Sequence, residues 1–337
     1  MERKLASIQQ ISKLTPIEGA DRIEQATCLG WSVVVRKGEF KEGDLCVFFE
    51  IDSILPDKEW AKFLEAKKFR VKTAKFKGVL AQGLALPITI LPLYCDPSTG
   101  ELYRKIGDDI TAELDVGKYD LPLPQDQEIC GPFPGELPKT DEIRLQSIPA
   151  ILNEVKDVPL VVTVKLDGTS CTIFKKDGEL IVCGRNWRIR EGNNKYWEVA
   201  RKYKLAEVLP EGFAVQGEVV GPGIQNNRLG LKNVDFFVFD VYSTGIRRHF
   251  NNSELHKYCS ELGLRTVPVQ CVLQSGDVDR PETIDEWLKF AEGKYSGTSN
   301  VREGIVVRPT CGGYSSVLKS RSSFKVINNS FLLRYEE

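Results

Sequence analysis

The chain has 337 residues, with 46 lysines and arginines against 47 aspartates and glutamates. This length is sufficient for two domains, and the near-zero net charge excludes a protein that attracts nucleic acid through overall positive charge. Hydrophobic residues make up 42% of the chain and charged residues 28%, as in soluble globular proteins. No uninterrupted apolar run approaches the ~18 residues of a membrane span, and the polar start does not resemble a signal peptide. We therefore expect an intracellular protein with no membrane partner.

The cysteine and histidine content is not typical of a disulfide framework or of a histidine metal site. The nine cysteines are scattered with no Cys-x-x-Cys pair, and most lie in apolar runs. This pattern indicates small buried side chains in a reducing compartment, and we expect the cytoplasm or the nucleus. The only two histidines, His249 and His256, give too few ligands for a histidine metal site.

Residues 1–118 are predicted to form an all-β domain. Five β-rich runs are separated by breaks that carry Gly, Pro or Asp, namely 5–11, 31–36, 45–51, 69–76 and 84–90. Only residues 58–68 have a helical pattern, with Trp60, Phe63 and Leu64 on one face. Five strands with one inserted helix predict an OB-type barrel, whose curved face commonly binds oligonucleotides.

A basic segment at residues 67–77 of this domain alternates cations with aromatic and apolar side chains. Two interpretations stay open for it. The outer face of such a strand can follow a phosphate backbone, or it can be an ordinary solvated strand face.

Residues 119–138 are predicted to be an inter-domain linker, because five prolines and several acids favour an extended, semi-rigid chain. Residues 139–337 are predicted to form a second, mixed domain. Its expected helices lie from 139 through 151, at 194–209, at 253–262 and from Thr283, where Glu286 completes a capping box. Its expected strands are 161–165, a hairpin of 171–174 and 180–183 through Asp177-Gly178, 213–220, 236–242, 305–308 and a stretch near 317–326.

The most informative stretch is Val-Val-Thr-Val-Lys-Leu-Asp-Gly-Thr-Ser at residues 161–170. A β-branched run ends at Lys165, and Asp167 and Gly168 follow. Burying an ammonium group is costly without a partner. Lysines placed in this way are often nucleophiles or phosphate contacts, because burial and nearby cations lower the lysine pKa. By itself this motif is a weak signal, and the downstream segments must outweigh the alternative of a surface lysine at the end of a strand.

Further segments with chemical character follow in order along the chain. They are Cys183-Gly184-Arg185-Asn186, Gly217-Glu218-Val219-Val220-Gly221-Pro222-Gly223-Ile224-Gln225, the aromatic strand around Phe239, Arg302-Glu303-Gly304, and a last basic stretch with Lys319, Arg321 and Lys325.

Taken together, this ordered set resembles the covalent nucleotidyltransferases, and specifically the ATP-dependent RNA ligases. The run that begins at Gly217 resembles nick-sealing ligases of the phage RNA-ligase-2 kind, and an OB domain in front of the transferase resembles the Naegleria-type ligases. The resemblance implies an α+β fold. We expect an N-terminal OB-type β-barrel, followed by an ATP-grasp-like nucleotidyltransferase domain of antiparallel sheets flanked by helices.

The resemblance also implies a role for each motif residue. The implied catalytic residues are Lys165, Arg185, Lys319 and Arg321. The implied nucleotide-binding residues are Val164, Asp167, Gly168, Asn186, Glu218, Phe239, Glu303 and Lys325. AMP from ATP would become attached to Lys165, Phe239 would stack on adenine, and Arg185 would hold a phosphate. The family usually ends its last motif with Lys-x-Lys, whereas this chain has Lys319-Ser320-Arg321. Lys325 is therefore an alternative second cation.

A divalent cation is expected beside these residues. Mg²⁺ prefers carboxylates and retained waters, so Asp167, Glu218 and Glu303 are the expected ligands for Mg²⁺ or Mn²⁺. By the resemblance, Asp167 and Glu218 also contact the ribose, and the sequence does not separate these two tasks.

The expected activity is ATP-dependent joining of RNA 3′-hydroxyl and 5′-phosphate ends, most simply at nicks in a duplex, by a monomer. Three alternatives stay open: an mRNA-capping-type guanylyltransferase, a DNA ligase, and a non-catalytic OB-fold RNA-binding protein. Capping enzymes place the OB domain after the transferase, whereas here it is expected to come first.

Overall fold

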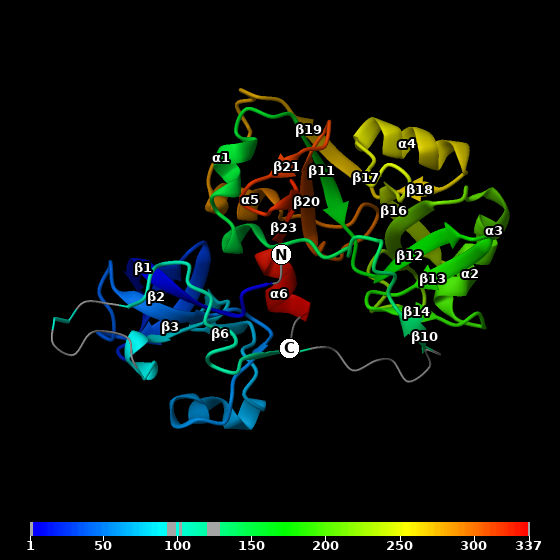
Figure 1. The fold of residues 1–337 in the computed structure, drawn as a ribbon. Helices are drawn as coiled ribbons and strands as arrows, with labels where there is room; N and C mark the ends of the chain where they lie inside the picture. Colours follow the sequence, from blue (N-terminus) through cyan, green and yellow to red (C-terminus); the bar gives the residue numbers. More distant parts are fainter. Residues whose placement is uncertain (1–2, 93–98, 101–102, 120–128, 336–337) are drawn as a thin grey trace. The chain divides into compact units, whose positions relative to one another are not determined.

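A computed structural model of the protein describes residues 3–92, 99–100, 103–119 and 129–335. The chain divides into two compact units. The first comprises residues 1–122, 145–149 and 332–337, and the second comprises residues 123–144 and 150–331. The fold is α+β (Figure 1). Among the helices in the described ranges, none is both long enough and apolar enough to span a membrane.

The first unit is built on a five-stranded antiparallel sheet. Its strand order is β3 (Trp31–Arg36), β2 (Ile23–Cys28), β1 (Ala6–Pro16), β4 (Leu45–Phe49) and β8 (Leu84–Pro87). Residues 6–10 of β1 pair with β4, and the rest of β1 pairs with β2. The register shifts between Ile11 and Lys13, and such an irregularity bends a strand. One long strand can therefore serve both sides of a curled, OB-type sheet.

Several short elements complete the first unit. They are β5 (Ser53–Ile54), the 3₁₀ helix η1 (Glu59–Lys67), β6 (Ala74–Phe76), β7 (Val79–Ala81), the 3₁₀ helix η2 (Ile88–Ile90), β9 (Gly117–Lys118) and the 3₁₀ helix η3 (Leu145–Ser147).

The OB prediction is confirmed, but two of its elements differ from expectation. The strand expected at 69–76 forms only at β6, because Phe69 and Val71 exchange backbone hydrogen bonds with residues 52–55 instead. The helix expected at 58–68 is a 3₁₀ helix. Trp60 and Leu64 pack on the core as predicted, whereas the Phe63 side chain is 59% exposed. Strand β2, which carries Glu, Gln and Thr, was not predicted.

The second unit contains two larger sheets. The eight-stranded sheet has the order β10 (Ile129–Pro132), β14 (Trp187–Ile189), β13 (Glu179–Cys183), β12 (Thr169–Lys176), β15 (Phe213–Val220), β16 (Asp235–Ser243) and β17 (Arg248–His249), and β18 (Arg265–Thr266) pairs in parallel with β16. The four-stranded sheet has the order β19 (Val269–Leu273), β11 (Leu160–Lys165), β20 (Gly304–Pro309) and β23 (Phe324–Ile327). A separate hairpin joins β21 (Tyr314–Ser315) to β22 (Ser320–Arg321).

The α-helices of the chain are short. They are α1 (Ile151–Val155), α2 (Lys195–Lys202), α3 (Leu205–Val208), α4 (Asn252–Glu261), α5 (Ile284–Phe290) and α6 (Asn329–Tyr335). The helix expected at 194–209 is interrupted at Lys204, which has a φ of 49°. The predicted capping box of Thr283 and Glu286 is present at the start of α5. The predicted hairpin turn is also confirmed, with positive φ at Asp177 and Gly178.

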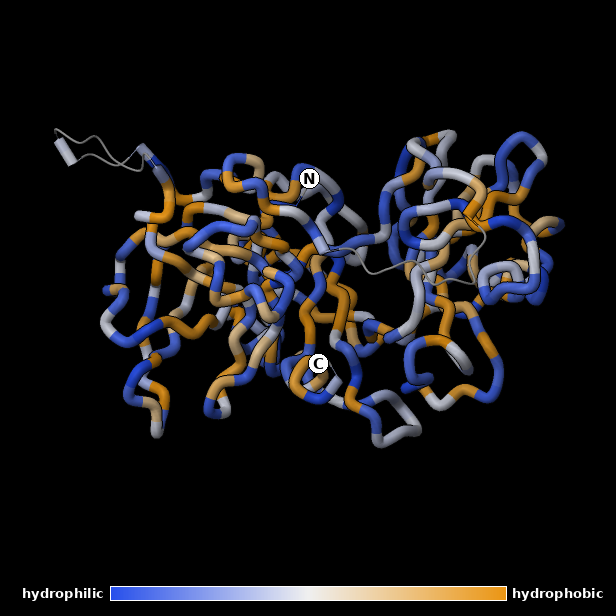
Figure 2. The backbone as a smooth tube through the Cα atoms, turned by 90° about the horizontal axis from the view of Figure 1, so that it is seen from below, coloured by the Kyte–Doolittle hydropathy of each residue, from blue (hydrophilic) through white to orange (hydrophobic). Residues whose placement is uncertain are grey.

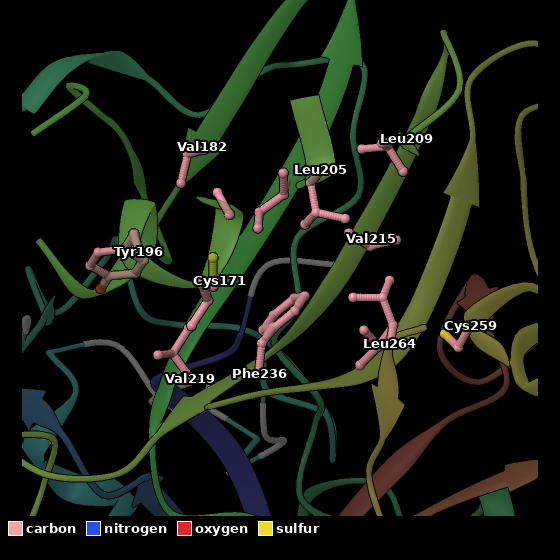
Figure 3. Close-up of a cluster of buried hydrophobic side chains, with 14 of the residues drawn as sticks. Cys171, Val182, Tyr196, Leu205, Leu209, Val215, Val219, Phe236, Cys259 and Leu264 are labelled. Carbon is pink, nitrogen blue, oxygen red and sulfur yellow. The ribbon is translucent and has the colours of Figure 1, made fainter. Parts of the chain in front are cut away.

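A large hydrophobic core of the second unit lies on one face of the eight-stranded sheet. Figure 3 shows Cys171, Val215 and Phe236 from the strands meeting Tyr196 and Leu205 from the helices. Figure 2 shows hydrophobic stretches along the interior strands and hydrophilic residues in many of the outer loops. Because side chains alternate along a strand, the opposite face of the same sheet carries polar residues such as Ser170 and Glu218, which pair across β12 and β15.

The predicted linker is described only in part. Residues 120–128 lie outside the described ranges, and Ile129–Pro132 forms β10, which pairs with β14. The helix expected from residue 139 is replaced by η3 and α1. The domain boundaries at 118 and 139 stay a prediction.

Candidate active site

Lys165 is the last residue of β11, an interior strand of the four-stranded sheet. Residues 160–163 of this strand are buried, as expected for a β-branched run between two neighbours. Lys165 pairs with Gly304 at the start of β20. The strand therefore carries the lysine out of the apolar interior at the point where the neighbouring strand begins.

The Lys165 ammonium donates a hydrogen bond to Glu303, with Nζ 2.9 Å from Oε2. The two side chains are 23% and 20% exposed, so the ion pair is half-buried. Gly304 has a φ of 155°, and a Cβ at this position would collide with the Val326 carbonyl oxygen of β23. A glycine is therefore required after Glu303 if β20 and β23 are to lie as they do.

Glu218 acts on the same lysine through its charge, from the other large sheet of the unit. It lies in β15, and Gly168 of the Lys-x-Asp-Gly motif packs directly on that strand. A Cβ on Gly168 would lie 2.5 Å from the Val219 carbonyl oxygen and 2.8 Å from Glu218 Cγ. The motif glycine thus permits the close approach that brings Lys165 and Glu218 together.

The charges around Lys165 shift its pKa in the direction opposite to expectation. Burial lowers the pKa, but the carboxylates of Glu303, Glu218 and Asp167 outweigh burial and raise it above its ordinary value. The prediction of a lowered pKa was wrong for the protein without ligands, because acids and not cations are the nearest charges. Burial, with the negative charge of Glu303 and Asp167, raises the pKa of Glu218 to about 8.

Asp167 is held by an arginine that the sequence did not indicate. Arg228 forms an ion pair with the Asp167 carboxylate, and the two side chains are only 9% and 12% exposed. Gln225, in the same loop after β15, donates a hydrogen bond to the Gly168 carbonyl oxygen (3.2 Å). Arg228 follows the Gly-Pro-Gly turn by five residues in an irregular segment, where no periodicity marks it as functional.

Of the three cations predicted for the last motif, Lys325 is the one that lies on the same face of the four-stranded sheet as Lys165. It pairs with Val306 across β20 and β23, and Val306 pairs with Thr163, two residues before Lys165 on the same face of β11. Burial, together with the positive charges of Lys165 and Arg144, lowers the pKa of Lys325 to about 7.

The other two cations of this motif lie elsewhere in the same unit. Lys319 is exposed in the turn between β21 and β22, with a φ of 51°. Arg321 forms an ion pair with the buried Asp240 (2.6 Å) and lies 3.9 Å from Glu142.

The remaining predicted residues lie around this centre. Arg185 is exposed, forms an ion pair with Asp141, and contributes positive charge that lowers the pKa of Glu218. The side-chain oxygen of Asn186 accepts from Lys139 Nζ at 3.4 Å. Val164 donates its backbone N–H to Pro268.

Phe239 of β16 lies against Arg308 of β20, whose Nη1 donates to the Phe239 carbonyl oxygen (2.7 Å). A cavity of about 370 Å³ adjoins this aromatic ring. Its lining includes Thr163 from β11, Val267, and Arg308. The cavity is therefore bounded by side chains from both large sheets of the second unit.

The three carboxylates predicted as metal ligands differ in their partners. Asp167 binds Arg228, and Glu303 binds Lys165. The structure gives the Glu218 carboxylate no hydrogen-bond or ion-pair partner among the residues it describes. Within those residues, no group of three or more His, Cys, Asp and Glu side chains is close enough to hold a metal ion. Burial is the main cause of the raised pKa of Glu218, and the charges of Glu303 and Asp167 add to it, so a divalent cation at Glu218 and Glu303 would lower this pKa.

Comparisons with known proteins agree with this geometry. A family model described as an OB-fold domain matches residues 5–88, and one described as RNA ligase matches residues 158–327. The second match covers Lys165, Glu218 and Glu303. This chain belongs to the RNA ligase family. A comparison with curated proteins returned no match.

Among solved structures, this ligase is similar over its whole length to the Naegleria gruberi RNA ligase. The structure of that protein with pyrophosphate shares 34% identity, covers 99% of both chains and has a TM-score of 0.86. A mutant of it with ATP and Mn shares 33% identity over 99% of this chain and 100% of that one, with a TM-score of 0.85. A mutant with AMP and Mn shares 34% identity over 99% of both chains, with a TM-score of 0.86. The predicted family and fold are therefore confirmed.

Proposed function

We propose that this RNA ligase uses ATP and works through a covalent AMP on Lys165. In the first step, Lys165 Nζ loses a proton and attacks the α-phosphorus of ATP. A P–N bond forms, the bond between the α-phosphorus and the bridging oxygen breaks, and pyrophosphate leaves. The observation that carries this proposal is a single half-buried lysine that contacts Glu303 and lies beside Glu218 and Asp167. The Naegleria ligase has been solved with ATP, AMP and pyrophosphate, which correspond to the substrate of such a step, the group that it transfers and the group that leaves.

Two further steps complete the joining of RNA ends. An oxygen of an RNA 5′-phosphate attacks the phosphorus of the lysine-bound AMP, so the P–N bond breaks and an AMP-capped 5′ end forms. The oxygen of an RNA 3′-hydroxyl then loses its proton and attacks the capped 5′-phosphorus, which forms the phosphodiester and releases AMP. We take a nicked duplex as the substrate and a monomer as the active form, within the cytoplasm or nucleus.

Different residues of the second unit are assigned to the base, the ribose and the phosphates of the nucleotide. The cavity beside Phe239 is within the size range of ligand pockets, and we assign it to the adenine base, stacked on Phe239. Asp167, fixed by Arg228, is assigned to the ribose. Lys325 is assigned to the phosphates, where its charge offsets the negative charge that develops in the transition state. Arg185 is assigned to a phosphate at the exposed rim.

The carboxylates of Glu218 and Glu303 are the proposed holders of Mg²⁺ or Mn²⁺. When bound, the ion supplies positive charge that favours a neutral Lys165 and stabilises the phosphate oxygens. In the protein without ligands, the same carboxylates keep Lys165 protonated. Glu303 therefore has two tasks, since it orients the amine and also sets the charge of the pocket.

The basic segment of the first unit supports RNA binding. Lys75 and Lys77 are exposed in and just after β6, Phe76 is exposed between them, and Lys68 is exposed at the end of η1. Cations that flank an aromatic ring suit a single-stranded or nicked backbone, because the lysines neutralise phosphates and the ring stacks on a base.

Labelling and sealing assays test the proposal. Incubation with α-labelled ATP and Mg²⁺ should label the protein on Lys165, and Lys165→Ala should abolish the label. The same protein should seal a nicked RNA duplex faster than a matched nicked DNA duplex. Label retained in the alanine variant would refute the covalent step, and preferential sealing of DNA would refute the RNA assignment.

A further inference from the structure

The hydroxyl group of Tyr295 connects the two chain segments that carry Lys165 and Glu303. It donates to the Lys165 carbonyl oxygen (3.1 Å), and it accepts from the backbone N–H of Asp167 (2.9 Å) and of Glu303 (3.2 Å). A tyrosine hydroxyl has one donor and two acceptor sites, so these three contacts use its full capacity. Tyr295 is 130 residues from Lys165 in the sequence but only eight from Glu303.

The tyrosine is itself fixed in place. Its ring is 4% exposed and packs in an apolar cluster with Leu166, Val220 and Val267. Its backbone N–H donates to the Asn300 carbonyl oxygen (3.0 Å), and its carbonyl oxygen accepts from the backbone and side chain of Thr298. The loop between α5 and β20 therefore holds the hydroxyl at a set position relative to both strands.

Two arginines extend this support. Arg302, next to Glu303, donates to the carbonyl oxygens of Phe290, Ala291 and Glu292 at the end of α5. The side-chain amide of Asn300 donates to the Arg228 carbonyl oxygen (2.8 Å), and Arg228 binds the Asp167 carboxylate. The loop is therefore tied to the end of α5 through Arg302, next to Glu303. It is connected to Asp167 through Asn300 and Arg228.

We propose that Tyr295 is a positioning residue for adenylylation of Lys165. Its hydroxyl group bonds to backbone atoms only, so we assign it no contact with the nucleotide. Its hydroxyl fixes the spacing between the end of β11 and the start of β20, and that spacing sets the contact between Lys165 Nζ and Glu303. This inference rests on the proposed function, because it concerns the step in which Lys165 is the nucleophile.

The proposal predicts that loss of the Tyr295 hydroxyl affects the first and last steps of the reaction unequally. In the first step the lysine must be aligned for attack on phosphorus, and misplacement of about 1 Å can cost on the order of 100-fold in rate. In the last step an RNA hydroxyl attacks a 5′ end that already carries AMP, and Lys165 is not the nucleophile. Loss of the Tyr295 hydroxyl should therefore slow the first step far more than the last.

Tyr295→Phe keeps the packed ring and removes only the hydroxyl. We expect the rate of Lys165 labelling by α-labelled ATP to fall about 10- to 100-fold, with the KM for ATP changed by less than about 3-fold. Sealing of a nicked duplex whose 5′ end is already adenylylated should fall by less than about 5-fold. Tyr203→Phe is the matched control, because it likewise removes one hydrogen-bonded tyrosine hydroxyl, which bonds the Asp235 carboxylate and not the segments of Lys165 and Glu303. This control should label at the wild-type rate.

Each outcome distinguishes a positioning role of Tyr295 from a purely structural role. Equal losses in both steps, or wild-type labelling by Tyr295→Phe, would overturn the proposal. Failure of the wild-type protein to label would instead refute the proposed function. If the variant does not fold, amide hydrogen exchange of the wild-type protein remains decisive. The amides of Asp167 and Glu303 should be protected, and exchange as fast as that of solvent-exposed loop amides would overturn the inference.

Discussion

Lys165 Nζ and Glu303 Oε2 lie 2.9 Å apart, although the two residues are 138 positions apart in the sequence. The contact depends on the antiparallel pairing of β11 with β20, which places Lys165 opposite Gly304. Because Glu218 and Asp167 add to the negative charge, Lys165, the proposed nucleophile, lies in an acidic environment when no ligand is bound.

Lys165 should titrate at a much higher pH than Lys325. The carboxylates raise the pKa of Lys165, whereas burial and neighbouring cations lower the pKa of Lys325 to about 7. In metal-free protein without nucleotide, a limiting amount of an amine-reactive reagent should therefore modify Lys325 near pH 8 and Lys165 only at much higher pH. Peptide mapping after labelling at a series of pH values gives both profiles. Glu303→Gln should move the Lys165 profile to lower pH, and coincident profiles for the two wild-type lysines would contradict this electrostatic description.

Lys325, and not Lys319, should be required for lysine adenylylation. Lys325 lies on the face of β23 that continues the Lys165 face of β11, while Lys319 is exposed in a turn. Lys325→Ala should reduce the rate of Lys165 labelling by about 100-fold or more, as expected for the loss of one group that stabilises developing charge. Lys319→Ala, a matched change of one exposed lysine, should remain within about 3-fold of wild type. The reverse ranking would show that the cation of the last motif was misassigned.

Glu218 should make the ligand-free protein less stable as the pH rises. Its ordinary pKa is 4.5, and burial with the neighbouring acids raises the value in the folded state to about 8. Below pH 4.5 the group is protonated in both states and contributes nothing. Between these values the unfolded chain releases the proton while the folded protein keeps it, so the free energy of unfolding falls as pH increases through this range.

Glu218→Gln removes this effect. The variant should be more stable than wild type at pH 8, by on the order of 1–3 kcal/mol, and similar to it near pH 4.5. Urea denaturation of both proteins in EDTA at the two pH values provides the measurement. A stability difference that does not change with pH would rule out the raised pKa as its cause.

The Arg228–Asp167 ion pair should be sensitive to loss of either partner alone. The pair is nearly inaccessible to solvent, and removal of one partner leaves an uncompensated buried charge. Arg228→Met should therefore lower the free energy of unfolding by about 3–5 kcal/mol. The double variant with Asp167→Asn should recover much of that stability, while its adenylylation stays impaired because the Asp167 carboxylate is missing. Chemical denaturation and α-labelled ATP give the two readouts, and an additive loss of stability in the double variant would contradict direct pairing.

Much of the local structure could be predicted from sequence because it depends on near neighbours. The β-branched run of β11 ends at Lys165 as expected, the Asp177-Gly178 turn has the positive φ values that its residues favour, and Thr283 with Glu286 caps α5. The residues that decide these features lie within a few positions of one another. Phe63 was misplaced because the 3₁₀ helix turns Ala61 and Leu64, which are three positions apart and share a face, toward the core, and leaves Phe63 exposed.

The order of the motifs along the chain was sufficient to indicate the ligase family and to name Lys165, Glu218 and Glu303. Which cation joins them was decided only by tertiary structure, because the register of β23 on β20, and not sequence spacing, brings Lys325 to the lysine. The supporting roles of Tyr295 and Arg228 were likewise hidden, since both residues lie in irregular loops and act on atoms 130 and 61 positions away. Even the direction of the Lys165 pKa shift depends on this assembly, because it is the convergence of three separate segments that surrounds the amine with acids.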